Sequence, residues 1–239
     1  MQSLTQLATY NNAVWCDTIC RSHNTLGEFH DDFWVCQQQT PIYYPNLVTL
    51  TPKANINLEH NALAEFLTTK REYGVSVKDS FAILDLAPFG FEQLFQAQWI
   101  LREISGETAS TRDTNLQWRQ ITSEKELLRW EEVWSQTSLS QNQLFLPTLL
   151  HDADICFIAA YKAKQIVAGA IANRTTGVVG ISNVFTPEQE PEKYWEGLVS
   201  MIATCYPDLP IVGYEQDESL ETTLRAGFTP LGPLSVWLK

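Results

Sequence analysis

The sequence predicts an α/β fold in which one mixed sheet combines antiparallel and parallel strands. Three observations support this prediction. Strand-like and helix-like patterns alternate from residue 116 to residue 239. Three successive strand patterns within this part predict an antiparallel meander. A helical pattern between two apolar strands then predicts a parallel strand–helix–strand crossover.

The meander and the helices before it come first in the second half of the chain. Residues 116–121 alternate as a short strand, and Thr122 or Ser123 caps the helix that follows, with Glu126 placed to complete a capping box. A second short helix is expected at Pro147, where proline suits the first helical position. The three strands of the meander are expected over residues 155–161, 166–173 and 178–185.

The crossover and the closing strand complete this half. A helix is expected to begin at Pro191. Residues 211–214 form a strand too apolar for a sheet edge, so they predict an inner strand. A last helix over 218–226 stops at Gly227, a residue suited to helix C-caps, and a strand over 234–238 follows.

The first half repeats part of this order, which predicts a duplicated unit whose first copy is truncated. Thr-Pro, Gly-Phe and Trp recur in the same order at nearly one offset, and coincidence of common dipeptides is the alternative. The matching pairs are Thr51 with Thr186, Gly90 with Gly227, and Trp99 with Trp237. The matching elements are a strand over 46–50, a helix over 59–73 and a strand over 75–77.

The division into domains follows from the segment that joins the two halves. Residues 105–111 are small and polar without periodicity, as in a domain linker. We therefore expect one domain over 1–110 and a second over 111–239. Residues 1–45 are expected to be mostly irregular beyond a helix over 12–21.

Charge and hydropathy exclude several classes of partner. The chain holds 28 acidic and 16 basic residues, a net charge of −12, and its cations are scattered, so nucleic-acid binding is not expected. No stretch approaches the roughly eighteen apolar residues of a membrane helix. The opening residues lack the basic and apolar segments of a secretory signal. We expect a cytoplasmic protein without a membrane contact.

The chain has 5 cysteines, an odd and small number that does not suit a disulfide framework, so reduced thiols are predicted. Cys16, Cys20 and His23 are spaced to share one helical face and raise the question of zinc. Their spacing matches no standard zinc pattern, so the favoured interpretation is a helix that uses the cysteines as core. No metal is expected.

The element order of residues 116–239 resembles the GNAT superfamily of N-acetyltransferases, and the first half resembles a truncated second copy. The best local marker is the close of the chain, an apolar strand and a helix followed by Ala226-Gly227-Phe228 and a terminal strand. The resemblance implies that acetyl-CoA inserts its pantetheine arm between the strands over 178–185 and 211–214. It implies cofactor-binding positions at Val184, Phe185, Thr186 and Gly197.

The segment that would hold the pyrophosphate departs from the pattern of this superfamily. Such a site needs free backbone amides at a helix N-terminus, usually supplied with glycines. Here Pro187 and Pro191 remove amide donors. Glu188, Glu190 and Glu192 place carboxylates where phosphates would lie.

Candidate catalytic residues lie at the ends of the two strands that the resemblance separates. Aminolysis of a thioester needs a base, amides that polarise the carbonyl, and an acid. The tyrosine that often supplies the acid is absent, since Thr223 stands in its place. The remaining candidates are Tyr214 and Glu215, of which alternation lets only one face the cleft, and Ser182 and Asn183 on the other strand. Asn183 is equally explained as a bridge over a strand bulge.

Two functions follow from these residues. The first is transfer of an acetyl group from acetyl-CoA to an amine, either a small molecule or a peptide, with the negative charge steering a cationic acceptor. The second is a catalytically silent module of the same fold that binds a ligand or partner. The departures in the phosphate segment and the missing tyrosine favour the second function, and fold by itself decides neither.

Overall fold

The computed structural model describes residues 2–53, 62–104, 116–137 and 143–239. The chain divides into two compact units. Unit 1 comprises Met1–Trp99 and Leu231–Lys239, and unit 2 comprises Ile100–Pro230. Two strands, β5 (Glu92–Arg102) and β11 (Thr229–Leu238), therefore contribute residues to both units.

The predicted division at residue 110 differs from these units at two places. Residues from Ile100 onward already belong to unit 2, and the last strand returns to unit 1. There Ser235–Leu238 of β11 pairs antiparallel with β4 (Ser76–Asp79). The expected linker over 105–111 lies outside the described residues.

Unit 1 contains a mixed sheet in the order β1-β2-β3-β4-β11. Its strands β3 and β4 are parallel, and the other neighbouring pairs are antiparallel. Its remaining described elements are α1 (Leu4–Ser22), β1 (Gly27–Phe29), β2 (Phe33–Cys36), β3 (Leu47–Thr49), α2 (Ala62–Thr68) and the short 3-10 helix η1 (Ala87–Phe89). Its core is apolar and drawn from these elements: Phe33, Val35, Leu47, Leu63, Phe66, Leu67, Val75, Val77, Leu86 and Phe91.

The amino-terminal segment is more regular than the sequence predicted. Helix α1 begins eight residues before the expected start at Asn12, because Ser3 and Gln6 form a capping box. The segment 22–45 was expected to be mostly irregular, and it contains one regular feature that the sequence did not predict, the antiparallel hairpin of β1 and β2. Short strands of this kind depend on pairing partners and carry little signal of their own.

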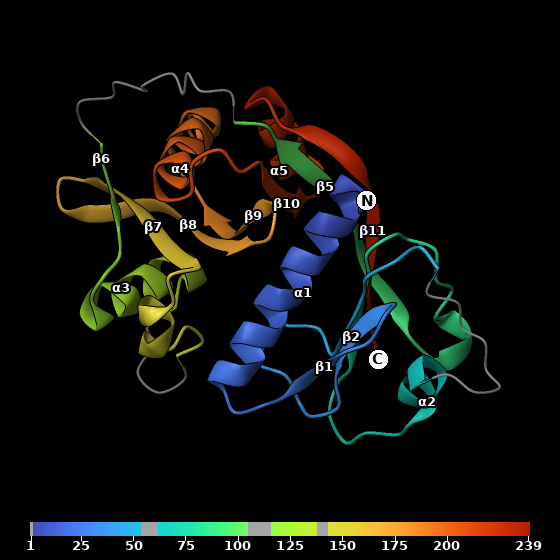
Figure 1. Ribbon diagram of the computed structural model, residues 1–239. Helices are drawn as coiled ribbons and strands as arrows, with labels where there is room; N and C mark the ends of the chain where they lie inside the picture. Colours follow the sequence, from blue (N-terminus) through green and yellow to red (C-terminus); the bar gives the residue numbers. More distant parts are fainter. Residues whose placement is uncertain (1, 54–61, 105–115, 138–142) are drawn as a thin grey trace. The chain divides into compact units, whose positions relative to one another are not determined.

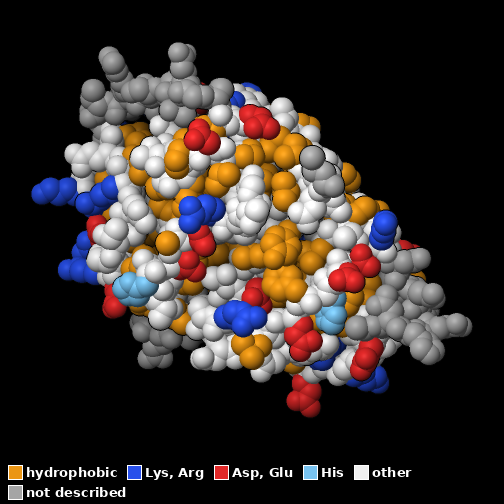
Figure 2. Space-filling model, in the orientation of Figure 1, with side chains coloured by type: hydrophobic (Ala, Val, Ile, Leu, Met, Phe, Trp, Pro, Cys, Tyr) orange, Lys and Arg blue, Asp and Glu red, His pale blue; other side chains and the backbone are white. Residues whose placement is uncertain are grey.

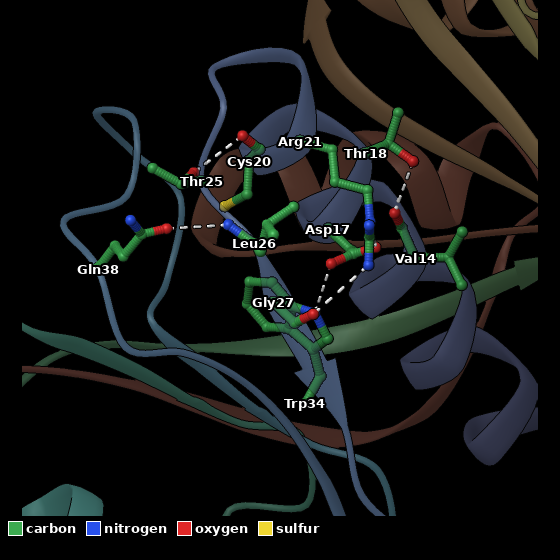
Figure 3. Close-up of polar contacts among 10 residues, drawn as sticks. All are labelled: Val14, Asp17, Thr18, Cys20, Arg21, Thr25, Leu26, Gly27, Trp34 and Gln38. Carbon is green, nitrogen blue, oxygen red and sulfur yellow. Dashed lines mark hydrogen bonds and ion pairs between the residues drawn. The ribbon is translucent and has the colours of Figure 1, made fainter.

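The end of α1 is fixed by polar contacts to this hairpin (Figure 3). Asp17 accepts a hydrogen bond of 3.0 Å from the Trp34 indole and pairs with Arg21 one turn later. Thr25 donates to the carbonyl of Cys20 at 2.8 Å. Cys16 and Cys20 are buried, as the core interpretation of this helix predicted.

Unit 2 contains the meander and the crossover. Its strands follow the order β10-β9-β8-β7-β6, antiparallel except for the parallel pair β9 and β10. Its described elements, besides residues of β5 and β11, are β6 (Gln117–Gln120), α3 (Glu124–Ser135), the 3-10 helix η2 (Pro147–His151), β7 (Ile155–Lys162), β8 (Gln165–Thr175), β9 (Val178–Phe185), α4 (Pro191–Cys205), β10 (Ile211–Glu215) and α5 (Asp217–Arg225). The predicted α/β fold with its meander and parallel crossover is confirmed.

The predicted signals for helix ends in unit 2 are confirmed. The Ser123 hydroxyl caps α3 by accepting the amide of Glu126, and the same hydroxyl donates to the Glu126 carboxylate. Pro191 opens α4, and Gly227 follows α5 with φ of 83°, a conformation that favours glycine. These signals are readable because each depends only on residues within one turn.

Helices α3 and α4 cover opposite faces of this sheet (Figure 1). Phe157 of β7 packs against Trp130 of α3 with ring centroids 5.5 Å apart. Its neighbours Cys156 and Ile158 point the other way and pack in one cluster with Leu198 of α4. Within the described part of the chain, no helix combines the length and apolar character needed to span a membrane.

Candidate functional site

The candidate site lies where the two parallel strands of unit 2 separate. Strands β9 and β10 pair only at Val179 with Ile211 and at Gly180 with Val212. Both strands continue beyond this point, β9 to Phe185 and β10 to Glu215. Because parallel strands end at the same edge of a sheet, the carboxyl ends of β9 and β10 lie at one edge. We call this region the fork, comprising residues 181–185 and 213–215.

A β-bulge in β9 shapes one arm of the fork. The register between β8 and β9 shifts, so that Ile171 pairs with Ser182 while Gly169 pairs with Phe185. One extra residue of β9 is accommodated there, and Asn183 takes up a left-handed conformation with φ of 52°. Asparagine tolerates this conformation better than most residues. The β9 strand thus has a bulge at Asn183, as one of the two interpretations of this residue requires, and the ligand role stays a prediction.

Polar groups of the fork are incompletely satisfied. The Ser182 hydroxyl is buried and has no hydrogen-bond partner among the described residues. Glu215, at the end of the other arm, is half-buried, and desolvation of its carboxylate raises its pKa to about 7. A carboxyl group with such a pKa is divided between its acid and base forms at neutral pH. Tyr214 beside it is also half-buried.

The side chains of the predicted cofactor positions on β9 are used for packing. Phe185 stacks edge-on against Trp130, with ring centroids 5.3 Å apart. Val184 lies against the core cluster below α4. A ligand in the fork would therefore contact the backbone of Val184, Phe185 and Thr186 rather than their side chains.

Gly197, the fourth predicted cofactor position, lies outside the fork, in α4. It is buried in α4, and a β-carbon added there would lie 2.2 Å from the indole of Trp118. The close approach of β6 to α4 explains the glycine, since any larger side chain would push the two elements apart. This contact was not predictable from local sequence patterns, because Trp118 and Gly197 lie far apart along the chain.

The start of α4 offers few free amides to an anion. Pro191 has no N–H, and the amide of Lys193 donates to the Glu190 carbonyl at 3.1 Å. The Glu192 carboxylate pairs with Arg225 of α5 at 2.5 Å. This contact and the backbone amide of Glu192 itself lower the pKa of Glu192. The helix N-terminus is thus occupied by the protein's own carboxylate, and Arg225 is a residue that the sequence did not single out.

Acidic and basic side chains are interspersed over the face seen in Figure 2. Among the described residues, no three His, Cys, Asp or Glu side chains are placed to bind a metal ion. Cys16, Cys20 and His23 therefore do not form a metal centre.

Comparison with known proteins identifies the fold. Neither a protein-family model nor a curated protein sequence matches the chain. Among solved structures, a GCN5-related N-acetyltransferase from Kribbella flavida is similar over 100% of this chain and 96% of its own, with a TM-score of 0.67 and 11% identity. A GNAT-family protein from Novosphingobium aromaticivorans is similar over 96% of this chain and 97% of its own, with a TM-score of 0.57 and 12% identity.

A tandem GNAT protein from the clavulanic acid biosynthesis pathway is also similar. The likeness covers 70% of this chain and 63% of that protein, with a TM-score of 0.50 and 8% identity. Identities this low establish architecture and leave chemistry to the residues of the fork. The chain has the fold of the GNAT superfamily.

Proposed function

We propose that unit 2 is an N-acetyltransferase that moves an acetyl group from acetyl-CoA to an amine, with Glu215 as the general base. The observation that carries this proposal is the half-buried carboxyl of Glu215 at the open end of the fork, with its pKa raised to about 7. The GNAT fold of the chain supports the same class of reaction.

The step assigned to Glu215 is removal of a proton from the acceptor. An amine is mostly an ammonium ion at neutral pH, and it becomes nucleophilic only when it loses a proton. The Glu215 carboxylate accepts that proton at its side-chain oxygen. The negative net charge of −12 attracts a cationic acceptor to the protein. Acetyl-CoA, when bound, supplies the acyl group as an activated thioester.

The fork fits one part of this donor better than another. The edge of β9 that faces β10 has no ladder partner beyond Gly180, and it suits an amide-bearing pantetheine arm, which can hydrogen-bond as an added strand does. The start of α4 suits the diphosphate poorly, since its amides and Arg225 are engaged with Glu190 and Glu192. The donor is therefore held mainly by its arm.

Titration calorimetry with acetyl-CoA and with S-acetylpantetheine, which lacks the nucleotide diphosphate, tests the proposal. We expect saturable binding of both below about 1 mM, with affinities within roughly tenfold of one another. The proposal is overturned if neither acetyl-CoA nor S-acetylpantetheine binds. The matched variant Glu192→Gln removes the carboxylate at the start of α4, and acetyl-CoA, but not S-acetylpantetheine, is then expected to bind more tightly.

A second candidate function is ligand binding without acetyl transfer. The occupied amides at the start of α4 favour it, because they remove the usual anchor for a diphosphate. Under this function acetyl-CoA or its arm binds, no acetylated amine accumulates with any acceptor, and Glu215→Gln changes neither result. Turnover that depends on Glu215 excludes it.

A further inference from the structure

A pair of thiols lies at the carboxyl-terminal end of α4, away from the end that begins at Pro191. Cys156 comes from β7, and Cys205 is the last residue of α4. Their sulfur atoms are 3.3 Å apart. A disulfide bond is about 2.0 Å long, so the sulfurs need to approach by little more than an ångström. Side-chain rotation supplies a shift of this size.

The two thiols differ in access to solvent. Cys156 is only 1% exposed, whereas Cys205 is partly exposed. Both contribute to the lining of a surface hollow of about 260 Å³, together with His151 and Tyr206. A hollow of this volume admits a small oxidant to Cys205. The hydrogen bond from Cys156 lowers the pKa of Cys205 to about 7, which raises its thiolate fraction.

We propose that Cys156 and Cys205 are an oxidisable dithiol that forms a disulfide with hydrogen peroxide, a modification site separate from the fork. The Cys205 thiolate attacks one peroxide oxygen, so that an S–O bond forms, the O–O bond breaks and hydroxide leaves, taking a proton to become water. The Cys156 sulfur then attacks the sulfenic sulfur, an S–S bond forms, and the hydroxyl leaves as water with the Cys156 proton. Two thiols are oxidised and one peroxide is reduced to two waters.

A second cysteine pair provides an internal control. Cys20 of α1 and Cys36 of β2 are both fully buried in unit 1. Their thiols also interact, which raises the pKa of Cys20 and lowers that of Cys36 to about 7. The two pairs share this electrostatic coupling and differ in access. If access controls oxidation, only the pair in unit 2 reacts in the folded protein.

Peptide mapping of the full chain tests the proposal without any substitution. The folded protein is treated with hydrogen peroxide, alkylated and digested with trypsin, whose peptides 130–162 and 194–225 each carry one cysteine. We expect these two peptides to be linked, with the loss of two hydrogen atoms in mass, and to separate with dithiothreitol. Peptides 1–21 and 22–53 should remain unlinked. Unlinked 130–162 and 194–225, each fully alkylated or over-oxidised, overturn the proposal.

Single substitutions test the assigned order of attack. Cys156→Ala leaves the accessible thiol alone, so its sulfenic acid should accumulate and react with dimedone. Cys205→Ala leaves the buried thiol, which should give at least tenfold less adduct. Cys36→Ala, the control, should form the disulfide as the unsubstituted chain does. Equal labelling of the Cys156→Ala and Cys205→Ala variants contradicts the assigned roles, and none of these readouts depends on acetyl transfer.

Discussion

Each unit contains a parallel pair of strands joined through a helix, and the two pairs end differently. In unit 1, β3 and β4 pair at Leu47 with Val77, and beyond the pair the Thr49 hydroxyl accepts the amide of Ser80 at 2.8 Å. In unit 2, β9 and β10 pair at Val179 with Ile211, and beyond the pair the Ser182 hydroxyl is without a partner among the described residues. The Thr49 hydroxyl therefore links the chain beyond the β3–β4 pair, whereas the β9–β10 pair ends at the fork.

The acidic residues at these strand ends show the same contrast. Asp79 at the end of β4 accepts backbone amides from Leu84 at 2.7 Å and from Phe81 at 3.3 Å. Glu215 at the end of β10 has its pKa raised by desolvation alone. A carboxylate that accepts several hydrogen bonds from backbone amides stabilises its loop. A carboxylate without such donors is available to a substrate. Chemistry is therefore expected in unit 2 and structural support in unit 1.

Glu215→Gln is expected to have the largest effect, because it removes the proposed base while conserving shape. Acetyl transfer to an amine should fall by about 10²- to 10⁴-fold in kcat. The measurement is steady-state acetylation with acetyl-CoA at saturating acceptor. Asp79→Asn is the matched control, and its activity per folded molecule should stay within about twofold. Full activity of the Glu215→Gln variant contradicts the role given to this carboxyl.

The pH dependence of stability tests the raised pKa of Glu215. The pKa of Glu215 rises from 4.5 to about 7 on folding, so the folded state binds the proton more tightly than the unfolded state. Stability contributed by this proton is present below about pH 4.5 and is lost as the pH rises to about 7. Urea unfolding near pH 8 should show the Glu215→Gln variant more stable than the unsubstituted chain by up to about 3 kcal/mol. Equal stabilities near pH 8 would refute the shifted pKa.

Thr49→Val is expected to have an intermediate effect on unit 1. The substitution conserves volume and removes the oxygen that accepts the buried amide of Ser80. A buried donor without a partner costs about 1–3 kcal/mol of the free energy of unfolding, measured by urea denaturation. Thr204→Val, which alters an exposed hydroxyl, is the control and should cost less than about 0.5 kcal/mol. A loss no larger than that of the control shows that the bridge does not hold the strands together.

Ser182→Ala is expected to have the smallest effect. Its hydroxyl is buried without a partner, so its removal breaks no bond among the described residues. The free energy of unfolding should change by less than about 0.5 kcal/mol or increase slightly. Thermal unfolding without ligand measures this change. A loss above about 1 kcal/mol contradicts an open fork, because it requires that the hydroxyl be bonded in the free protein.

Many helix ends of unit 2 were predictable from the sequence, because the residues that start and stop these helices lie next to them in the chain. The Ser123 cap of α3, Pro191 at a helix start and Gly227 after a helix end each act within one turn of chain. The bulge at Asn183 was anticipated as one of two interpretations, since a polar residue in an apolar strand needs a special backbone or a ligand. The hairpin of β1 and β2 was missed because strands this short take their stability from neighbouring strands.

The sequence by itself determined the order of elements in unit 2, the α/β class and the acidic segment before α4, because periodicity and helix caps are properties of neighbouring residues. Only the tertiary structure decided which distant residues meet. It pairs β11 with β4, seats Trp118 over Gly197, joins Glu192 to Arg225 and brings Cys156 to Cys205. The physical reason is that such contacts arise from packing of separate elements, whose register and facing surfaces no single segment encodes.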